Sequence, residues 1–338
     1  AEDLVLSFIQ NIRKKSSNSF FPVLQAPIGV GSAFEGWSSS KDGPVYRFLV
    51  PLKPPCGHAF HLEPSTAGEM PPRTFRIRME LVCTCTTEQQ VEKVRCFLHQ
   101  SEEEPWGNQA FRHLHPLCTG SYLDVKRTAR WLNQNVKAVW KAVPQLVQCC
   151  PTVLPSSCSC KFQVVKGGEK ILTIEMIFGV QLGNSDVFLS SQPAEATFTR
   201  STMWTESYAV AEVKFFRHMT WALPNNCHLK CLQACAHLLT SRSFSTYTFK
   251  TVVMHLLTTT IFSSQNSSNL LQQLECIILY LHYCLKEKCL NHFFIGNENM
   301  LEEIVLAAGQ MSEPLNLFQH FAQNPFAYAQ ACREFKQL

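Results

Sequence analysis

The stretch Gly29-Val30-Gly31-Ser32-Ala33-Phe34-Glu35-Gly36-Trp37 guides the interpretation of this chain. It places a Gly-Ser pair between an apolar segment that predicts a strand and a short segment that predicts a helix. The backbone N–H groups of such a turn, together with the Ser32 hydroxyl, can hold a phosphate group. A short Gly-Ser pair also occurs at ordinary helix starts, so phosphate binding and a plain helix start both remain open.

The strand that follows, Pro44-Val45-Tyr46-Arg47-Phe48-Leu49-Val50-Pro51-Leu52, carries no carboxylate. Two carboxylates spaced two residues apart on a strand would lie on the same face. Such a pair can hold the metal ions that position and neutralise a triphosphate during phosphoryl transfer. The sequence therefore combines a candidate phosphate cradle with the loss of the acids that this chemistry needs.

Composition indicates a folded globular protein with a large core. The chain has 338 residues, of which 46% are apolar and 17% charged, and this length predicts two domains or lobes. The net charge of +4 is mild and does not favour a dedicated nucleic-acid binder. No run of 18 apolar residues occurs, and the chain begins without Met inside a helical pattern. We therefore expect a fragment whose leader or anchor, if any, lies upstream.

The sixteen cysteines do not form a regular framework of short spacings. Cys227, Cys231 and Cys235 follow an i, i+4, i+8 stripe, which favours core packing over metal ligation. Other cysteines would be disulfide partners in an extracytoplasmic domain, although the sequence does not fix the pairing. These are Cys83 and Cys85, Cys149 and Cys150, and Cys158 and Cys160.

Two other signals have an ordinary explanation beside a functional one. The segment His113-Leu-His115-Pro-Leu-Cys118 is interpreted as a Pro-broken loop, because no second ligand pair stands at a metal-site spacing. Asn266-Ser267-Ser268 is a glycosylation acceptor in a secretory setting and has no such meaning elsewhere.

Hydrophobic periodicity predicts an α+β fold with two lobes, residues 1–203 and 204–338. For the first lobe we expect helices at residues 1–19 and 86–103 and a spine helix within 120–148. We expect strands at 45–52, 59–63, 75–81 and 160–165. A further strand over 171–182 pairs with 160–165 through the turn Lys166-Gly167-Gly168-Glu169. The second lobe is predicted to be helical throughout, at about 204–219, 226–241, 245–262, 268–287 and 298–310, with two short helices to the end.

The motifs together resemble the male-abnormal nucleotidyltransferase-fold family, which includes cyclic GMP-AMP synthase. The resemblance covers nearly the whole chain and rests on the Gly-Ser stretch and on segments of the helical lobe. These are Trp204-Thr-Glu-Ser207-Tyr208-Ala-Val-Ala-Glu212, His228-Leu-Lys-Cys231-Leu232, Tyr247-Thr-Phe-Lys250-Thr251 and Asn291-His-Phe-Phe-Ile295. Within that family, Val50-Pro51-Leu52 and Phe178-Gly179-Val180-Gln181-Leu182 look most like the inositol 1,4,5-trisphosphate receptor-interacting proteins, especially their "like 1" branch. The implied fold is a bilobal nucleotidyltransferase-like fold, with a mixed sheet and spine helix in one lobe and helices in the other.

The resemblance implies an inactive catalytic site. The first two metal-binding acids of the family fall on Val45 and Arg47, or on Pro44 and Tyr46 if the register shifts by one, and the third falls on Glu175. A single carboxylate cannot hold the metal pair. We expect Glu175 to pair with Arg47, so that a guanidinium replaces the metal. Asp42 and Glu35 lie nearby in the sequence, but not at the required strand spacing.

Other ligand positions of the family are also changed or uncertain. Tyr247, with Thr246 beside it, matches the base-binding position, where stacking on a base and packing within the protein are both open. The family's phosphate-binding lysine, on the preceding helix, falls on Ala236. The inserted zinc-binding loop of cyclic GMP-AMP synthase is absent between Trp221 and Cys231. Without that loop and without a basic spine helix, we expect neither DNA sensing nor zinc.

The resemblance implies a single-pass membrane-anchored protein whose spanning segment lies upstream of residue 1, with the side of the membrane left open. It also implies a receptor as partner, namely the inositol trisphosphate receptor or T-cell-receptor signalling chains. We therefore expect a non-enzymatic interaction domain that needs no cofactor and binds no nucleic acid. A residual nucleotide-binding protein or nucleotidyltransferase is the alternative, and nucleic-acid binding through the lobe helices is a third option.

Overall fold

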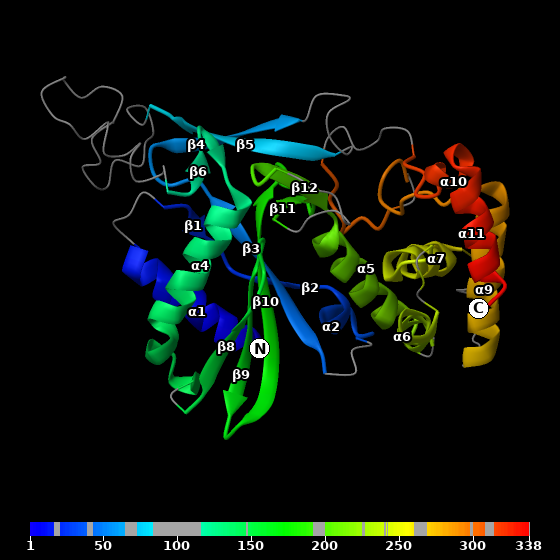
Figure 1. Cartoon of the computed structure of the whole chain (residues 1–338), viewed down its shortest axis with the longest axis horizontal. Coiled ribbons are helices and arrows are strands. Elements are labelled where there is room, and N and C mark those ends of the chain that lie inside the picture. Colours follow the sequence, from blue (N-terminus) through cyan, green and yellow to red (C-terminus); the bar gives the residue numbers. More distant parts are fainter. Residues whose placement is uncertain are drawn as a thin grey trace, which may run out of the picture. The chain divides into compact units, whose positions relative to one another are not determined.

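The structure is a computed structural model, and Figure 1 shows how its helices and strands follow one another. It describes residues 1–16, 21–38, 43–64, 73–83, 116–146, 148–191, 200–224, 227–239, 241, 243–259, 269–297, 300–307 and 314–337. The predicted helix over 86–103, the histidines of the 113–118 segment, Asp42 and Asn266 lie outside these ranges. Within them, no helix is both long and apolar enough to cross a membrane.

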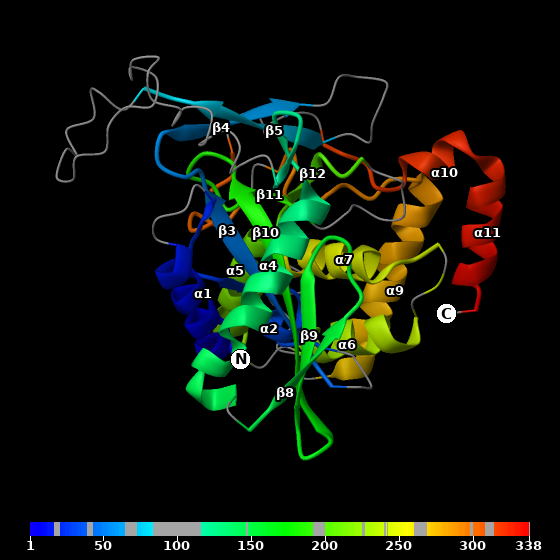
Figure 2. The same cartoon turned by 60° about the vertical axis from the view of Figure 1, so that its left-hand side comes forward.

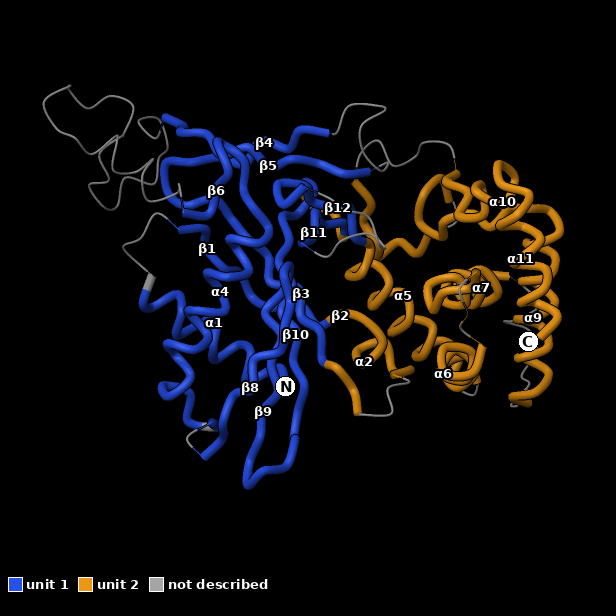
Figure 3. The backbone as a smooth tube through the Cα atoms, in the orientation of Figure 1, with its two compact units in different colours: residues 1–29, 46–183, 187–207 blue, residues 30–45, 184–186, 208–338 orange. Residues whose placement is uncertain are grey.

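The described chain divides into two compact units (Figure 3). Unit 1 comprises residues 1–29, 46–183 and 187–207, and unit 2 comprises residues 30–45, 184–186 and 208–338. The predicted lobe boundary after residue 203 differs from this division, because it falls inside a strand, Met203–Ser207. Residues 30–45, which carry the Gly-Ser turn, belong to the same unit as the C-terminal helices, a grouping that no local sequence pattern indicates.

Among the described residues the strands form one sheet, in the order β1-β3-β10-β11-β12-β5-β7-β6. In addition, β2 pairs with β3, β4 with β5, β9 with β10 and β8 with β9. The strands are β1 Val23–Leu24, β2 Ile28–Val30, β3 Val45–Lys53, β4 His58–Pro64, β5 Thr74–Leu81, β6 Cys118–Thr119, β7 Tyr122–Leu123, β8 Cys150–Leu154, β9 Cys160–Lys166, β10 Glu169–Gln181, β11 Phe188–Ser190 and β12 Met203–Ser207.

Two helices of unit 1, α1 Glu2–Ser16 and α4 Val125–Val139, pack against each other beside this sheet (Figures 1 and 2). Phe8 of α1 and Trp140, which follows α4, meet Phe162 of β9 in an aromatic cluster. The ring centroids lie 5.4 to 5.7 Å apart, within the range of favourable aromatic contacts. This cluster joins the two helices to the sheet.

The spine helix α4 is shorter than the predicted helical pattern over 120–148. It begins after Asp124, whose carboxylate accepts a hydrogen bond from the Arg127 backbone N–H at 3.0 Å and so caps the helix. Two short 3-10 turns, Trp140–Ala142 and Pro144–Leu146, replace its predicted end. Pro144 disfavours the α conformation at the residue before it, which explains the break.

The predicted hairpin of β9 and β10 is confirmed. Gly167 and Gly168 have φ of 60° and 88°, as a two-residue turn of type I′ requires. Register places Lys166 opposite Glu169 at the turn and Lys161 opposite Glu175 further along. The strand β8, which pairs with β9, was not predicted, because Pro151 inside it reads as a break.

Unit 2 is built from helices around an aromatic core. They are α2 Ser32–Glu35, α5 Ala209–Ala222, α6 His228–Leu238, α7 Thr246–Thr258, α9 Leu270–Glu287, α10 Gln319–Gln323 and α11 Pro325–Phe335. Phe215 of α5 meets Phe293 with ring centroids 4.8 Å apart, and Phe293 meets Phe294 at 5.1 Å. All three side chains are fully buried. The α+β class is therefore observed, with the helices concentrated in unit 2.

Two predicted helices are wrong. The helix expected over 204–219 starts only at Ala209, because residues 203–207 form β12 and complete the sheet of unit 1. The helix expected over 298–310 is absent from the described residues 300–307, which form a turn and irregular chain. In both segments apolar spacing suited a helix, but pairing and packing elsewhere in the chain determined the conformation.

Candidate functional site

The Gly-Ser turn has the strand–turn–helix geometry that its sequence predicts. Gly31 follows β2 with a φ of 78°, which favours glycine, and Ser32 then opens α2. Gly36 ends the helix at a φ of 88°, and its N–H donates to the Ser32 carbonyl at 3.0 Å. A Cβ on Gly36 would lie 3.1 Å from Leu229 Cδ1, so the turn is closely packed. That Gly31 and Ser32 form a vestigial phosphate cradle stays a prediction.

Arg47 and Glu175 form the ion pair expected from the sequence. Arg47 Nε donates to Glu175 Oε2 at 3.1 Å, from neighbouring strands β3 and β10 of unit 1. The other oxygen, Glu175 Oε1, accepts a hydrogen bond from Ser159 Oγ at 2.9 Å. The side chain of Glu175 is 12% exposed and that of Arg47 is 35% exposed. Both oxygens of the one carboxylate at the family's metal positions are therefore occupied by protein donors.

The positions of the two missing acids carry no group that could replace them. Val45 and Arg47 lie two residues apart in β3 and so share a face of the strand, and Tyr46 lies between them. Among the described residues no group of three or more His, Cys, Asp or Glu side chains could hold a metal ion. The chemistry left at this point is that of a guanidinium–carboxylate pair with hydroxyl neighbours.

Tyr247 is held by the protein through its hydroxyl. This group lies 2.8 Å from His292 Nε2, and the Tyr208 ring lies against the same imidazole with centroids 4.7 Å apart. Burial raises the pKa of the Tyr247 hydroxyl well above its ordinary value, so the group stays protonated. Thr246 begins the same helix, α7, and Ala236 lies on α6, where it offers no charge to a phosphate. Base stacking by Tyr247 stays a prediction.

The structure adds a buried charged cluster that sequence reasoning missed. Lys250 of α7 donates from Nζ to Glu35 Oε1 at 2.7 Å and to Glu212 Oε2 at 2.5 Å. Trp37 Nε1 donates to the other Glu35 oxygen at 2.6 Å. These residues all belong to unit 2, and the lysine also lies 5.8 Å from the Phe216 ring centroid. The cluster ties the end of α2 to α5 and α7.

The electrostatics of this cluster follow from burial. Side-chain exposure is 0% for Glu35, 8% for Lys250 and 10% for Glu212. Burial raises the pKa of Glu35, and the nearby Lys250 charge offsets this only in part. Burial acts to lower the pKa of Lys250, but the charges of Glu212 and Glu35 outweigh it, so the pKa is raised. Lys250 is therefore firmly protonated between two carboxylates.

All four residues of the charged cluster lie in the family motifs, but the motifs do not reveal that these residues contact one another. Glu35, Trp37, Glu212 and Lys250 each lie in a motif that carried the resemblance, but Glu35 and Lys250 are 215 residues apart. A signal was present in the composition of Phe34-Glu35-Gly36-Trp37, where a lone carboxylate lies among groups that are usually buried. Its partner could not be identified from spacing.

Of the predicted cysteine stripe, Cys231 and Cys235 of α6 pack in the core, whereas Cys227, just before the helix, is only partly buried. Cys231 and Cys235 are fully buried, and burial raises the pKa of each thiol to about 12. Cys150, Cys158 and Cys160, for which disulfides were an open alternative, are free thiols. Cys85 lies outside the described residues.

Comparison with known proteins places these observations in a family. Residues 227–313 match the family described as the Mab-21 protein HhH/H2TH-like domain. The inositol 1,4,5-trisphosphate receptor-interacting protein-like 1 of Rattus norvegicus is 32% identical over 351 residues, covering 100% of this chain and 64% of the relative. Its counterpart in Mus musculus is 32% identical over 349 residues, with the same coverage. The inositol 1,4,5-trisphosphate receptor-interacting protein of Homo sapiens is 29% identical over 338 residues, covering 92% of this chain and 61% of the relative.

The chain spans less than two thirds of the length of these relatives. The Mab-21 domain lies within unit 2 and fits a nucleotidyltransferase-like fold of α+β class, as predicted. Whole-length similarity confirms the resemblance that the Gly-Ser and Phe-Gly-Val-Gln-Leu motifs carried. The chain is a relative of the inositol 1,4,5-trisphosphate receptor-interacting proteins, within the Mab-21 nucleotidyltransferase-fold superfamily.

Proposed function

We propose that this chain is a non-enzymatic interaction domain on a degenerate nucleotidyltransferase scaffold. The observation that carries the proposal is the Arg47–Glu175 pair, which is joined by the Ser159 hydroxyl. Phosphoryl transfer on this scaffold needs metal ions that position the attacking oxygen and offset charge on the triphosphate. A guanidinium on the one remaining carboxylate supplies positive charge but offers no exchangeable coordination site. The scaffold could therefore still bind a ligand, but not transfer a phosphoryl group.

The partner that we propose is a receptor protein. The relatives are named for interaction with the inositol 1,4,5-trisphosphate receptor. We extend this interaction to the present chain, with T-cell-receptor signalling chains as the second candidate receptor. We also propose that the chain is the folded part of a single-pass membrane protein. An anchor would hold the domain close to a receptor in the same membrane and raise its effective concentration there.

Receptor binding is tested by measuring the affinity of the purified chain for each immobilised receptor. We expect saturable binding to one of them, unchanged by 5 mM ATP with Mg²⁺, since the proposed interaction does not require a nucleotide. A matched sample of heat-unfolded chain serves as the control for unspecific adsorption. Absence of saturable binding to both receptors would contradict both named partners.

The alternative is a residual nucleotide-binding protein or nucleotidyltransferase, and the preserved turn at Gly31 and Ser32 favours it. The two functions predict different melting curves. A nucleotide at fifty times its Kd would stabilise the folded state by about 2 kcal/mol and raise the melting temperature by several degrees. We expect no shift with ATP or GTP at millimolar concentration, with either Mg²⁺ or Mn²⁺.

The Glu175→Gln variant makes this test specific. If the wild type showed a metal-dependent shift in melting temperature and Glu175→Gln did not, the Glu175 carboxylate would still bind a metal. The proposal of a degenerate scaffold would then be wrong. A metal-independent shift that survives in Glu175→Gln would establish nucleotide binding without catalysis. Either result is separable from receptor binding, which is measured both with and without nucleotide.

A further inference from the structure

The exposed charged residues of the spine helix α4 and of the turn after it are all basic. The exposed positions include Lys126, Arg130, Lys137 and Lys141, which we call the basic face, with Gln134 between them. The spacings of four, four, three and four residues place these side chains on one side of a helix. At 1.5 Å per residue, the face extends over roughly 20 Å.

No acidic side chain within α4 or the turn after it balances the charge of the basic face. Among the described residues none of its four cations takes part in an ion pair, and residues 125–168 contain no Asp or Glu in the sequence. The expectation that the spine helix is not basic is therefore wrong. The mild net charge of +4 concealed the local excess, because acidic residues lie elsewhere in the chain.

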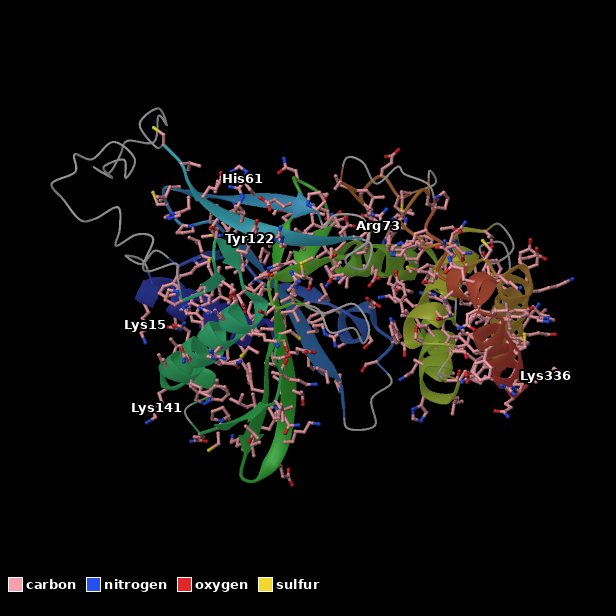
Figure 4. All side chains as sticks on the ribbon, turned by 45° about the horizontal axis from the view of Figure 1, so that its top comes forward. Lys15, His61, Arg73, Tyr122, Lys141 and Lys336 are labelled. Carbon is pink, nitrogen blue, oxygen red and sulfur yellow. The ribbon has the colours of Figure 1, made fainter. Side chains whose placement is uncertain are left out.

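A second group of cations belongs to the helix that packs against α4. The last turn of α1 carries Arg13, Lys14 and Lys15, of which the two lysines are exposed. Figure 4 labels Lys15 and Lys141, which project outward from the same side of unit 1. The basic surface of unit 1 thus includes the ends of two adjacent helices.

Charge complementarity requires an anionic partner, and the composition of the face narrows its class. Protein interfaces depend on buried aromatic or large apolar anchors, whereas the exposed apolar positions among these cations are only Ala138 and Ala142. Binding to single-stranded nucleic acid uses aromatic stacking, and the face has no aromatic side chain. A lipid leaflet needs only cations that reach its surface together.

We propose that the basic face of α4 docks on the surface of a bilayer that contains anionic phospholipid. Each Lys or Arg close to such a surface increases partitioning roughly fivefold, and the attraction extends over about one Debye length, near 8 Å at physiological salt. This inference goes beyond receptor binding and does not need a membrane anchor, because the cations alone supply the attraction. It orients unit 1 with the outer side of α4 toward the lipid.

The experiment is co-flotation of the purified chain with vesicles, in the absence of receptor and nucleotide. We expect binding to vesicles of phosphatidylcholine with 30% phosphatidylserine, no binding to phosphatidylcholine alone, and release in 0.5 M NaCl. The variant Lys126→Gln/Arg130→Gln/Lys137→Gln/Lys141→Gln is expected to lower the partition coefficient at least tenfold. Circular dichroism and the melting temperature of each variant verify that it is folded.

A matched control removes the same number of exposed cations from unit 2, in Lys230→Gln/Lys286→Gln/Arg333→Gln/Lys336→Gln. It has the same net charge as the test variant and is expected to bind vesicles as the wild type does. Equal loss in both variants, or wild-type binding that is independent of phosphatidylserine, would overturn the proposal. So would retention of duplex DNA through the same four residues without vesicle binding, which would assign the face to nucleic acid.

Discussion

Replacing Lys250 with methionine is expected to lower the free energy of unfolding by about 3–5 kcal/mol, which is the usual cost of removing one partner from a buried ion pair. The lysine bridges Glu35 and Glu212, at 2.7 and 2.5 Å, in a part of unit 2 where all three side chains are at most 10% exposed. Methionine fills a similar volume, so the expected loss reflects uncompensated charge rather than a cavity. Urea denaturation followed by circular dichroism measures it.

The pH dependence of Lys250→Met tests the cause. Burial already raises the pKa of Glu35 in the wild type, and removal of the lysine is expected to raise it further. A carboxyl group whose pKa is raised on folding binds its proton more tightly in the folded state, so its destabilising effect is greatest above the folded pKa. The loss should therefore shrink as the pH falls toward the ordinary carboxyl range, near 4.

Two comparisons make the result for Lys250 interpretable. Glu35→Gln/Glu212→Gln/Lys250→Met removes all three charges and is expected to recover part of the lost stability at neutral pH. Lys286→Met, at an exposed position of α9, is expected to change stability by less than about 0.5 kcal/mol. A loss below about 1 kcal/mol in Lys250→Met, or one that does not vary with pH, would contradict a charge-based role for the cluster.

Trp204→Ala is expected to lower the free energy of unfolding by a similar amount, about 3–5 kcal/mol. The side chain is 0% exposed and sits in β12, where Trp204 pairs with Phe75 of β5. Its Nε1 donates to the Leu123 carbonyl at 3.0 Å, just before the start of α4. Truncation would leave a large cavity and a buried carbonyl without this donor, and both effects destabilise.

Trp221→Ala provides the matched control, because Trp221 is 81% exposed at the end of α5. We expect its midpoint in urea to stay within about 0.5 kcal/mol of the wild type. Trp204→Phe keeps most of the apolar volume and should lose less than Trp204→Ala. If both tryptophan-to-alanine variants unfolded at the same urea concentration, β12 would not be the structural strand that the geometry indicates.

The sequence predicted elements whose signals are local. The β9–β10 turn was identified because Gly167 and Gly168 supply the positive φ of a two-residue hairpin. Arg47 and Glu175 were paired because the family pattern places both at one site, and an unpaired carboxylate in an apolar strand is costly. Capping explains why the start of α4 lies close to the predicted pattern.

The features that were missed depend on distant parts of the chain. Trp204 was assigned to a helix because the apolar spacing after it is helical. The segment instead forms strand β12, which pairs with β5 and places Trp204 opposite Phe75. The partner of Glu35 lies 215 residues away, and no local pattern identifies it. The basic face of α4 was obscured by averaging charge over the whole chain, since only the exposed side of the helix is cationic.

The grouping of residues 30–45 with unit 2 has a consequence for biosynthesis. The ribosome synthesises Glu35 long before Lys250, which lies 215 residues further along the chain. At roughly 5–20 residues per second, this part of the chain takes about 10–40 s to translate. During this interval Glu35 lacks its partner Lys250, and burying the unpaired carboxylate would be costly. The segment that starts the family signature can therefore reach its native environment only after α7 has been made, long after its own synthesis.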